Sequence, residues 1–583
     1  MKNFIKPLLM AIVLIVSMNA CKKINPTDDI TFVINSDIYR SPVLVKFINA
    51  NPNSTTQPGY NATSPEATYK VGITGTEAKY IVMNDGDTSL KASRGFLQFS
   101  IGSNRVPSAT SPISFTLDVT FPGFARVNKT FYITDTLEKS IEVYVQELAS
   151  PAPGSSIVDA TDVLSATQPT VIQTSTSATM TEATKITIPE GTVLKDASGN
   201  TINSNNLHST VIHYGIGDEA SLRAFPGGLQ TRNAVDKNGN KIDSVIDFIT
   251  AGCLQINMQA GGKEVRQFSK PLEVEVDINP SFYNAYSADG KLKEGDSIPV
   301  WSMEEGSGQW VLEGEAPVIV KNNKLVAKFS ASHLSVWNLD YWANSTSYYY
   351  RYGRWYPVKL PTCNNVATIN LQSAPDNFTG NVYLDMFDQI GNKLTWGSSY
   401  YPIAMVNGKA SIVADFRGRV AIPSATIKAY ATAYGKSVNA SSTFSPCSQS
   451  SVTVTLPITR PAPTSSINLS VDIAAFCSNK NLKVNYSGWV YMFDNSATQW
   501  WNAWTYKYIV AGQPAYFNNL KENGNYTFYA WNGSWYSTQV VLKKQDEAKW
   551  GNLPATGAVE ASAKYDAASN TLKVTGIYKI KCK

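Results

Sequence analysis

Alternation of apolar and polar residues is the dominant pattern along this chain. In the run Ser114–Val119, the side chains of Phe115, Leu117 and Val119 fall on one face and polar side chains on the other, which is the period of a half-buried β-strand. No long stretch places apolar residues at the i, i+3, i+4, i+7 spacing of an amphipathic helix. The pattern therefore predicts an all-β protein.

The length of the chain requires several hydrophobic cores. At about 100 to 200 residues per domain, 583 residues predict three to five domains. Aromatic residues are plentiful, and charged residues make up only 16% of the chain. We expect a multidomain string of antiparallel β-sandwich modules of the immunoglobulin-like or transthyretin-like kind.

The N-terminal segment carries a targeting pattern. Lys2 and Lys6 precede an apolar run, Leu8–Val16, and the small-residue approach Ser17–Ala20 leads to Cys21. A membrane span needs about 20 apolar residues, so this run is too short to be one. The order resembles the signal peptide and lipobox of a bacterial lipoprotein of the Bacteroidetes outer-membrane type. The alternative is an ordinary secretory signal in which the cysteine is incidental.

The resemblance implies cleavage before Cys21 and lipidation of its thiol and new amino group. It predicts an exported protein that is lipid-anchored in the outer membrane, on either its periplasmic or its cell-surface face. The formal charge of the chain is +5, two units of which belong to the signal, and no dense Lys/Arg run is present. We therefore expect the membrane as a partner and no nucleic acid.

Two breaks rich in Pro and Ser, at 149–156 and 461–466, divide the rest of the chain. The predicted organisation is a signal peptide at 1–20, a tether at 21–29, and four β-modules at 30–148, 157–342, 355–460 and 467–583.

The second half of the first module is predicted to form a strand, a turn and two further strands. Phe115–Thr120 leads to a Pro122–Gly123–Phe124 turn, and Lys129–Ile133 and Ile141–Val145 follow. This pattern resembles the carboxypeptidase-regulatory-like sandwiches at the front of Bacteroidetes surface lipoproteins.

The second module has a recognisable beginning and end. It begins near Ile188–Pro189–Glu190–Gly191 and ends with His333–Leu334–Ser335 followed by Trp337. These two ends resemble the β-module of cartilage intermediate layer proteins and, more distantly, the β-domains of ankyrins and netrin receptors. The resemblance implies a fold and little chemistry.

The last two modules read as an imperfect duplication. Val382–Asp388 matches Val490–Asp494, and Ile427–Ala431 matches Tyr526–Ala530. We expect two copies of one sandwich.

Four cysteines bracket these two copies. In an oxidising compartment the spacing suggests disulfides between Cys363 and Cys447 and between Cys477 and Cys582, although four cysteines allow three pairings. Cys253 lies in a strand-like run and is expected to be a buried small hydrophobe.

The sequence contains no familiar catalytic or metal-binding motif. It has three histidines, and His208 and His213 are expected on opposite faces of one strand. We predict no metal, no cofactor and no conventional enzyme. Paired carboxylates for glycan processing stay open as an alternative, with Glu304, Glu305, Asp385 and Asp494 as examples.

His333–Leu334–Ser335 gives a second enzymatic alternative. It matches the His-Leu-Ser/Thr site at which adhesion receptors cleave themselves. The resemblance implies that Ser335 attacks the preceding carbonyl, that His333 is the base, and that the Leu334–Ser335 bond breaks. The simpler interpretation is a final strand whose Leu334 and Trp337 face the core.

The final module concentrates tryptophans that are suited to stacking on sugar rings, namely Trp500, Trp501, Trp504, Trp531 and Trp535. Strand periodicity puts Trp500 and Trp501 on opposite faces, and aromatic residues in strands also serve packing. The sequence predicts a non-catalytic envelope lipoprotein for binding or adhesion, with a glycan or a surface protein as ligand. The final module is expected far from the membrane.

Overall fold

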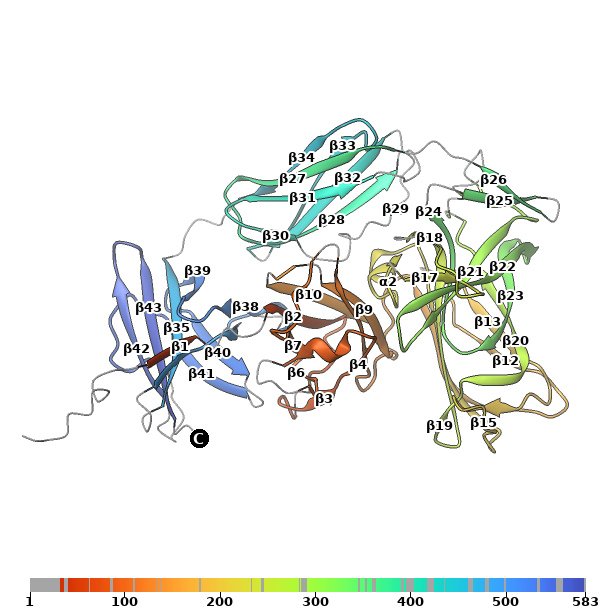
Figure 1. The fold of residues 1–583 in the computed structure, drawn as a ribbon, viewed down its shortest axis with the longest axis horizontal. Coiled ribbons are helices and arrows are strands. Elements are labelled where there is room, and N and C mark those ends of the chain that lie inside the picture. The colour runs from red at the N-terminus through yellow and green to blue at the C-terminus, as the bar shows by residue number, and fades with distance from the viewer. Residues whose placement is uncertain are drawn as a thin grey trace, which may run out of the picture. The chain divides into compact units, whose positions relative to one another are not determined.

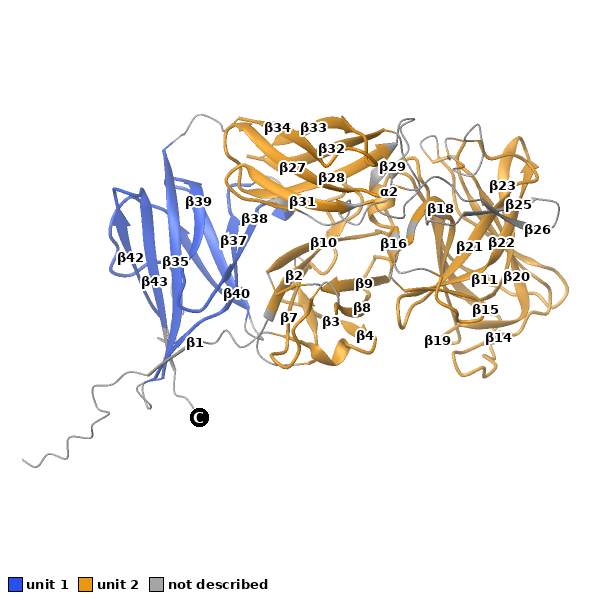
Figure 2. Cartoon of the chain, turned by 45° about the horizontal axis from the view of Figure 1, so that its top comes forward, with its two compact units in different colours: residues 1–39, 463–583 blue, residues 40–462 orange. Residues whose placement is uncertain are grey.

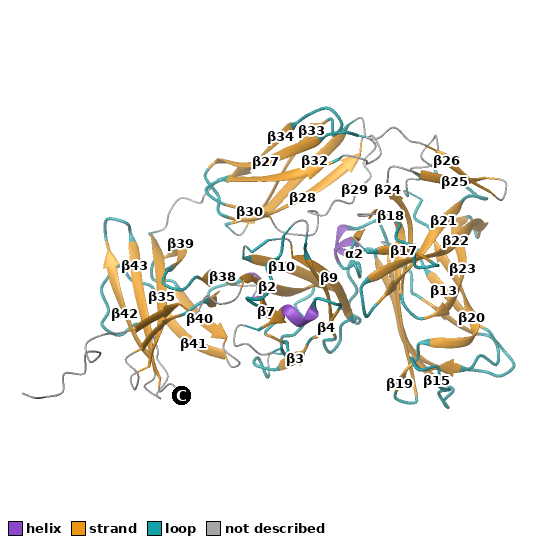
Figure 3. Cartoon of the chain, in the orientation of Figure 1, coloured by secondary structure: helices purple, strands orange, loops and turns teal. Residues whose placement is uncertain are grey.

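Nearly all of the described chain is β-strand (Figure 3), which confirms the all-β prediction. The structure is a computed structural model. It describes residues 32–580 with gaps at 36–39, 62, 84–87, 109–110, 134, 137, 178–179, 232, 243–245, 281, 283, 285–290, 344–346, 352–353, 359–362, 389–392, 395–402, 417–423, 435, 460–464, 478–481, 498–499, 532–534 and 552–558. Within those ranges, no helix is long and apolar enough to cross a membrane.

The chain forms two compact units, coloured separately in Figure 2. One unit comprises residues 40–462, and the other comprises residues 1–39 together with 463–583. Each unit is built from β-sheets packed face to face (Figure 1), because alternating strands bury one face each.

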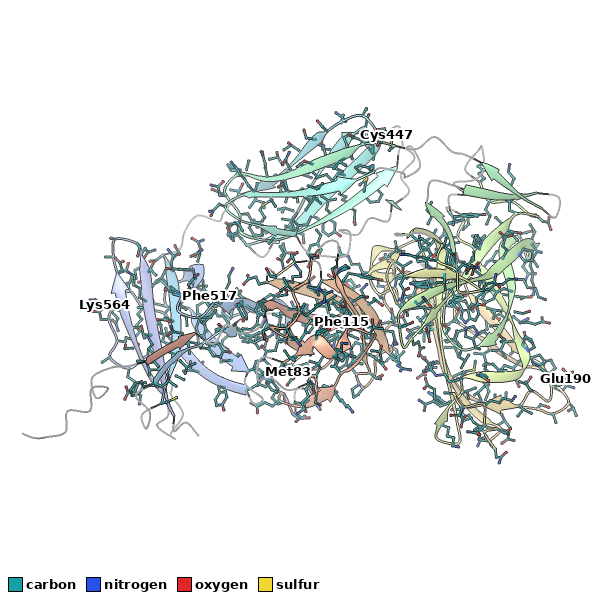
Figure 4. All side chains as sticks on the ribbon, viewed as in Figure 1. Met83, Phe115, Glu190, Cys447, Phe517 and Lys564 are labelled. Carbon is teal, nitrogen blue, oxygen red and sulfur yellow. A yellow bond between two sulfur atoms is a disulfide. The ribbon has the colours of Figure 1, made fainter. Side chains whose placement is uncertain are left out.

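The first sandwich of the larger unit packs an aromatic core. Phe99, Phe115 and Phe131 meet at its centre, with ring centroids 5.4 Å apart for the first two and 5.5 Å apart for the last two; Figure 4 labels Phe115. Its strands are β2 (Arg40–Asn49), β3 (Thr68–Lys70), β4 (Gly72–Thr74), β5 (Ile81–Val82), β6 (Lys91–Ser93), β7 (Phe96–Ile101), β8 (Ile113–Val119), β9 (Val127–Ile133) and β10 (Lys139–Val145).

The middle module follows one long hydrogen-bonded path of strands. Ten strands lie in the order β11-β15-β18-β24-β21-β22-β23-β20-β13-β12, and four short strands branch from them. The path consists of β11 (Ser155–Val163), β12 (Thr170–Gln173), β13 (Thr184–Ile188), β15 (Asn206–Tyr214), β18 (Ile246–Ala260), β20 (Gln267–Asp277), β21 (Ser297–Glu304), β22 (Gln309–Lys321), β23 (Lys324–His333) and β24 (Val336–Ala343). The amide of Ser175, just after β12, donates to the carbonyl of Ile157 in β11, so the path curves back on itself.

The first sandwich and the middle module share a core across the Pro/Ser-rich break. Ala125 and Ala152 belong to the same buried cluster as Phe248, Trp301 and Trp310. The break therefore does not separate two independent hydrophobic cores.

The third and fourth sandwiches have the same strand order. In the third, β27 (Val366–Pro375) pairs antiparallel with β31 (Lys409–Asp415) and parallel with β34 (Ser451–Ile458). In the fourth, β35 (Ser466–Cys477) pairs antiparallel with β39 (Ala515–Lys521) and parallel with β43 (Thr571–Ile580).

The second sheets of these two sandwiches also correspond. The third sandwich has β28 (Gly380–Asp388), β30 (Ile403–Met405), β32 (Ala425–Ala433) and β33 (Lys436–Phe444); the fourth has β37 (Gly488–Asp494), β38 (Trp504–Ile509), β40 (Asn525–Trp531) and β41 (Trp535–Val541). In both sheets the first strand lies between the second and third, and the fourth strand lies at the edge. The predicted module boundaries themselves stay predictions.

The sheets are not purely antiparallel, which corrects part of the expectation. Besides the parallel pairs of the third and fourth sandwiches, β10 pairs in parallel with β2 in the first. These pairs join strands that lie far apart in the chain, and local alternation carries no information about their direction.

Strand β1 (Phe32–Asn35) belongs to the smaller unit. It pairs in parallel with β36 (Leu482–Asn485) of the fourth sandwich, and β36 in turn pairs with β35. The predicted first module begins at residue 30, so the pairing of β1 with the fourth sandwich differs from that prediction.

Candidate functional site

Alternation along four strands builds a continuous aromatic face on the fourth sandwich. Tyr491 pairs with Tyr506 on one side and with Tyr529 on the other, and Trp531 pairs with Trp535. Directly paired residues lie on the same face of a sheet. We call the resulting set the aromatic face: Trp489, Tyr491, Phe493, Trp504, Tyr506, Tyr508, Tyr529, Trp531 and Trp535.

The opposite face of the same sheet packs into the core. Val490, Met492 and Phe528 are buried there against Phe517 and Leu572. Figure 4 labels Phe517. Packing of the hydrophobic core explains why the inward-facing side chains are apolar. It does not explain why nine residues on the outward face are aromatic.

The rings of the aromatic face contact one another in edge-to-face and tilted arrangements. Trp504 lies 4.9 Å from Phe493 and 5.3 Å from Tyr529 between ring centroids, and Trp535 lies 5.1 Å from Trp531. Trp489, Tyr491 and Trp531 are only 2%, 1% and 6% exposed, whereas Trp504 and Trp535 are half-buried. Mutual packing fixes the ring orientations, and the half-buried indoles keep part of their surface accessible.

Polar groups border the aromatic face on the same side of the sheet. Asn525 and Thr527 precede Tyr529 at two-residue intervals in β40, and Gln539 follows Trp535 at the same parity in β41. The amide of Gln539 donates to Asn525 Oδ1 at 2.9 Å, and the amide of Asn495 donates to Thr527 Oγ1 at 3.0 Å. The surface thus combines flat rings with fixed amide and hydroxyl groups.

Trp500 and Trp501 do not lie in a strand, which corrects the prediction that they face opposite sides of one. They form the 3-10 turn η2 (Trp500–Asn502) before β38, with ring centroids 6.2 Å apart. Both are half-buried. Of the five predicted tryptophans, the structure brings Trp504, Trp531 and Trp535 onto the aromatic face.

The remaining members of the aromatic face were not predicted as ligand-binding residues. Phe493, Tyr506 and Tyr508 alternate with other residues at a period of two, so the signal was present in the sequence. Recognising it required the strand pairing, because the alternation alone does not say which face is the core.

The His-Leu-Ser segment lies at the end of β23. Ser335 is 4% exposed, and its hydroxyl donates to the carbonyl of Met303. His333 Nε2 lies 3.8 Å from Glu313 Oε1, and the His333 ring packs 5.0 Å from Trp337. The serine proton is directed to a carbonyl rather than to the imidazole, so cleavage after Leu334 stays a prediction without geometric support here.

Three of the four acids named for glycan processing have structural partners, and the fourth, Asp385, is buried in β28 at 2% exposure. Glu305 bonds to both Arg126 and Arg266, at 3.1 and 2.7 Å, and Asp494 accepts the amide and hydroxyl of Ser496. Glu304 accepts the hydroxyl of Ser307 at 2.6 Å. These contacts explain the three carboxylates as ion-pair and turn-forming groups.

The histidines of β15 lie on opposite faces, as predicted. His208 is exposed beside Asp159, with Nε2 3.3 Å from Oδ1, whereas His213 is fully buried beside Thr184. Burial lowers the pKa of His213 to about 4 against the opposing effect of Glu182 and Asp277. Across the described part of the chain, no three His, Cys, Asp or Glu side chains come together as a metal site.

The cysteines follow the predicted arrangement where they are described. Cys363 and Cys447 form a disulfide across 84 residues, and Cys447 is labelled in Figure 4. Cys477 is disulfide-bonded, but its predicted partner Cys582 lies outside the described residues, as does Cys21. Cys253 is a buried free thiol.

A small cavity of about 40 Å³ lies within the larger unit, between the first sandwich and the middle module. The side-chain amide of Asn128 lines it with no hydrogen-bond partner for Nδ2 or Oδ1, and Gln146 Oε1 is likewise unpartnered. Lys129 also lines it, and burial lowers its pKa to about 8. The size and polarity suit one or two ordered waters rather than an organic ligand.

No family model matches this chain, and no curated protein matches its sequence. Among solved structures, a Bacteroides eggerthii protein assigned to cell adhesion is 9% identical, with 38% of this chain and 99% of that chain covered and a TM-score of 0.12. The major pilin subunit BcpA of Bacillus cereus is 9% identical over 93% and 99%, also with a TM-score of 0.12. The major pilin from Streptococcus pyogenes is 9% identical over 38% and 100%, with the same TM-score. At these TM-scores the similarity establishes neither family nor function.

Proposed function

We propose that this protein is a non-catalytic lipoprotein of the cell envelope that binds glycans through the aromatic face of its fourth sandwich. The observation that carries the proposal is the face itself, with nine aromatic rings on the side of a sheet opposite the core, six of which keep part of their surface accessible. Sugar rings present flat apolar C–H surfaces to aromatic rings and hydroxyls to polar groups. The rings at Trp504 and Trp535 and the amides at Asn525 and Gln539 supply both kinds of contact.

The anchoring part of the proposal rests on the lipobox-like residues that end at Cys21. Residues 22–31 separate this cysteine from β1, and a fully extended chain of that length reaches about 40 Å at most. Since β1 pairs with β36, lipidation at Cys21 holds the fourth sandwich near the membrane. On this proposal, the final module lies near the anchor, whereas the sequence alone suggested that it lies far from it.

Glycan binding is tested on the full mature chain with a glycan array and with calorimetry on the best hits. Trp504→Ala and Trp535→Ala should each weaken binding about five- to tenfold, the loss expected for one stacked ring. Tyr516→Ala is the matched control, because Tyr516 is 54% exposed on β39, outside the aromatic face. Retained binding in both tryptophan variants, or no glycan bound by the folded wild type, would reject the proposal.

Anchoring is tested separately in cells. Palmitate labelling should be lost in Cys21→Ser while the protein is still exported. Protease shaving of intact cells then distinguishes the cell-surface face from the periplasmic face. Labelling that persists in Cys21→Ser would contradict the lipoprotein assignment.

A further inference from the structure

We propose that the core of the fourth sandwich holds a second, unassigned binding site, a cavity for a small ring compound that carries one hydrogen-bond acceptor. The cavity measures about 100 Å³ and lies between the two sheets, within the smaller unit. Tyr529 borders both sites, but the cavity lies between the sheets whereas the aromatic face lies on the outer side of its sheet, so the proposal goes beyond glycan binding.

Strand register explains why this cavity exists. On one sheet Gly576 of β43 pairs with Ile473 of β35 and with Ala561 of β42 (Val559–Asp566). On the facing sheet Ala530 pairs with Val490 and with Tyr536. All six residues line the cavity. Facing sheets lie about 10 Å apart and need large side chains to fill the space between them. Here the central residue of each set of three paired residues is small, Gly576 on one sheet and Ala530 on the other.

The backbone conformation at position 576 does not require glycine. Its φ lies outside the positive range, and an added Cβ would find its nearest neighbours, the carbonyl of Asp472 and Cγ1 of Ile473, at 3.9 Å. Because 3.9 Å is an ordinary van der Waals distance, a side chain would fit at this position. The glycine therefore leaves space that a larger residue would have filled.

Trp550 supplies a second, independent observation. It lines the cavity at 4% exposure, with its ring 5.5 Å from Phe528, and its indole Nε1 is buried without a hydrogen-bond partner. A buried Trp N–H ordinarily has an acceptor, and leaving it unpaired costs about 1 to 3 kcal/mol. The chiefly apolar wall suits an organic group better than water, which needs two to four polar partners.

These features define the ligand chemically. The volume fits a single six-membered ring, the walls are apolar, and the unpaired N–H requires one acceptor such as a carbonyl oxygen. Tyr536 is 43% exposed, so the cavity reaches the surface beside edge strand β41.

The experiment uses two fluorinated probes and the full mature chain. 4-Fluoroacetophenone carries a carbonyl acceptor and 4-fluorotoluene does not, and ¹⁹F NMR titration measures the affinity of each. The folded wild type should bind both probes saturably and should prefer the ketone.

Two variants separate the apolar part of the site from the polar part. Gly576→Leu should abolish binding of both probes by filling the cavity, and Ala561→Leu serves the same purpose if that variant does not fold. Trp550→Phe keeps an aromatic ring but removes the N–H, so it should weaken ketone binding about three- to tenfold and leave fluorotoluene binding unchanged.

Trp504→Ala is the control for independence from the aromatic face and should leave both affinities unchanged. Unchanged probe binding in folded Gly576→Leu, or no binding to the wild type, would overturn the cavity site. An equal effect of Trp550→Phe on both probes would overturn the acceptor requirement. None of these outcomes depends on whether the protein binds glycans.

Discussion

Arg126 and Asp118 form a two-pronged ion pair, with Nε and Nη2 of the arginine 2.7 and 2.6 Å from the two carboxylate oxygens. Both residues belong to the first sandwich. The remaining nitrogen of Arg126 contacts Glu264 and Glu305 of the middle module, at 3.0 and 3.1 Å. The ion pair thus orients a guanidinium that joins two modules, as planar bidentate geometry allows.

Loss of this arginine should weaken the joint between the modules. Arg126→Ala removes one ion-pair partner from each of three carboxylates, those of Asp118, Glu264 and Glu305. Glu305, whose side chain is 8% exposed, is left with Arg266 alone. We expect the free energy of unfolding of this part to fall by about 1 to 3 kcal/mol, measured by urea denaturation.

The matched control is the exposed pair of Lys573 and Asp566, whose nitrogen and oxygen lie 2.8 Å apart. Lys573→Ala removes an ion pair of similar length that solvent screens, so no measurable change is expected. If both variants lose the same stability, the joint has no special role.

Burial of His213 should make the stability of the middle module depend on pH. The folded pKa is about 4 and the ordinary value is 6.5, so below pH 6.5 the unfolded chain takes up a proton that the folded chain does not. Stability is fully present above pH 6.5 and should fall as the pH decreases toward 4, by about 3 kcal/mol in total. Melting temperatures across this range measure the effect.

The exposed histidine of the same strand provides the comparison. His213→Gln should flatten the pH profile between 6.5 and 4, whereas His208→Gln should leave it unchanged because that side chain is 47% exposed. A profile that is identical in all three proteins would show that other groups cause the acid sensitivity.

The Cys363–Cys447 disulfide should stabilise the third sandwich strongly. It closes a loop of 84 residues, for which chain entropy gives about 4 to 5 kcal/mol as an upper value. The double variant Cys363→Ala/Cys447→Ala should therefore unfold at much lower denaturant concentration.

Cys253 should stay unreactive toward a thiol reagent until the protein unfolds, since it is buried. Rapid labelling of the native protein would contradict its placement.

Removal of β1 should expose the edge of β36. Deleting residues 32–35 leaves Leu482–Asn485 with β35 as a partner on one side alone. Amide hydrogen exchange at 482–485 should become faster, while exchange in β31 and β34 of the third sandwich should not change. Unaltered exchange at β36 would show that this pairing does not persist in solution.

The Leu334–Ser335 bond should stay intact. The hydroxyl of Ser335 is buried and donates to the Met303 carbonyl, so it is not presented to His333 as a nucleophile. Intact mass measurement of the purified protein should give one chain, and Ser335→Ala should have the same mass apart from the substitution. Two fragments that meet at Ser335, lost in that variant, would reverse this conclusion.

Local patterns predicted the strands well. Ser114–Val119 falls within β8, and the Pro189–Glu190–Gly191 turn is present, with Gly191 at a φ of +64°. The Cys363–Cys447 disulfide matches the pairing that the spacing suggested among the three possible ones. Each of these features depends on residues within one run or on one covalent partner.

Non-local relationships were not predictable. The parallel pairing of β10 with β2, the addition of β1 to β36, and the turn at Trp500–Trp501 all depend on partners distant in the chain. The aromatic residues of the fourth sandwich were visible as a set. The set becomes a surface only when the register of β37, β38, β40 and β41 places nine of them on one face.

By itself, the sequence determined that this is an all-β, multidomain chain with a lipobox-like start, because alternation and short motifs are local properties. Tertiary structure alone decided which face of the fourth sandwich is aromatic and where Gly576 and Ala530 leave the core unfilled. The physical reason is strand register, since a shift of one residue moves every side chain of a strand to the opposite face.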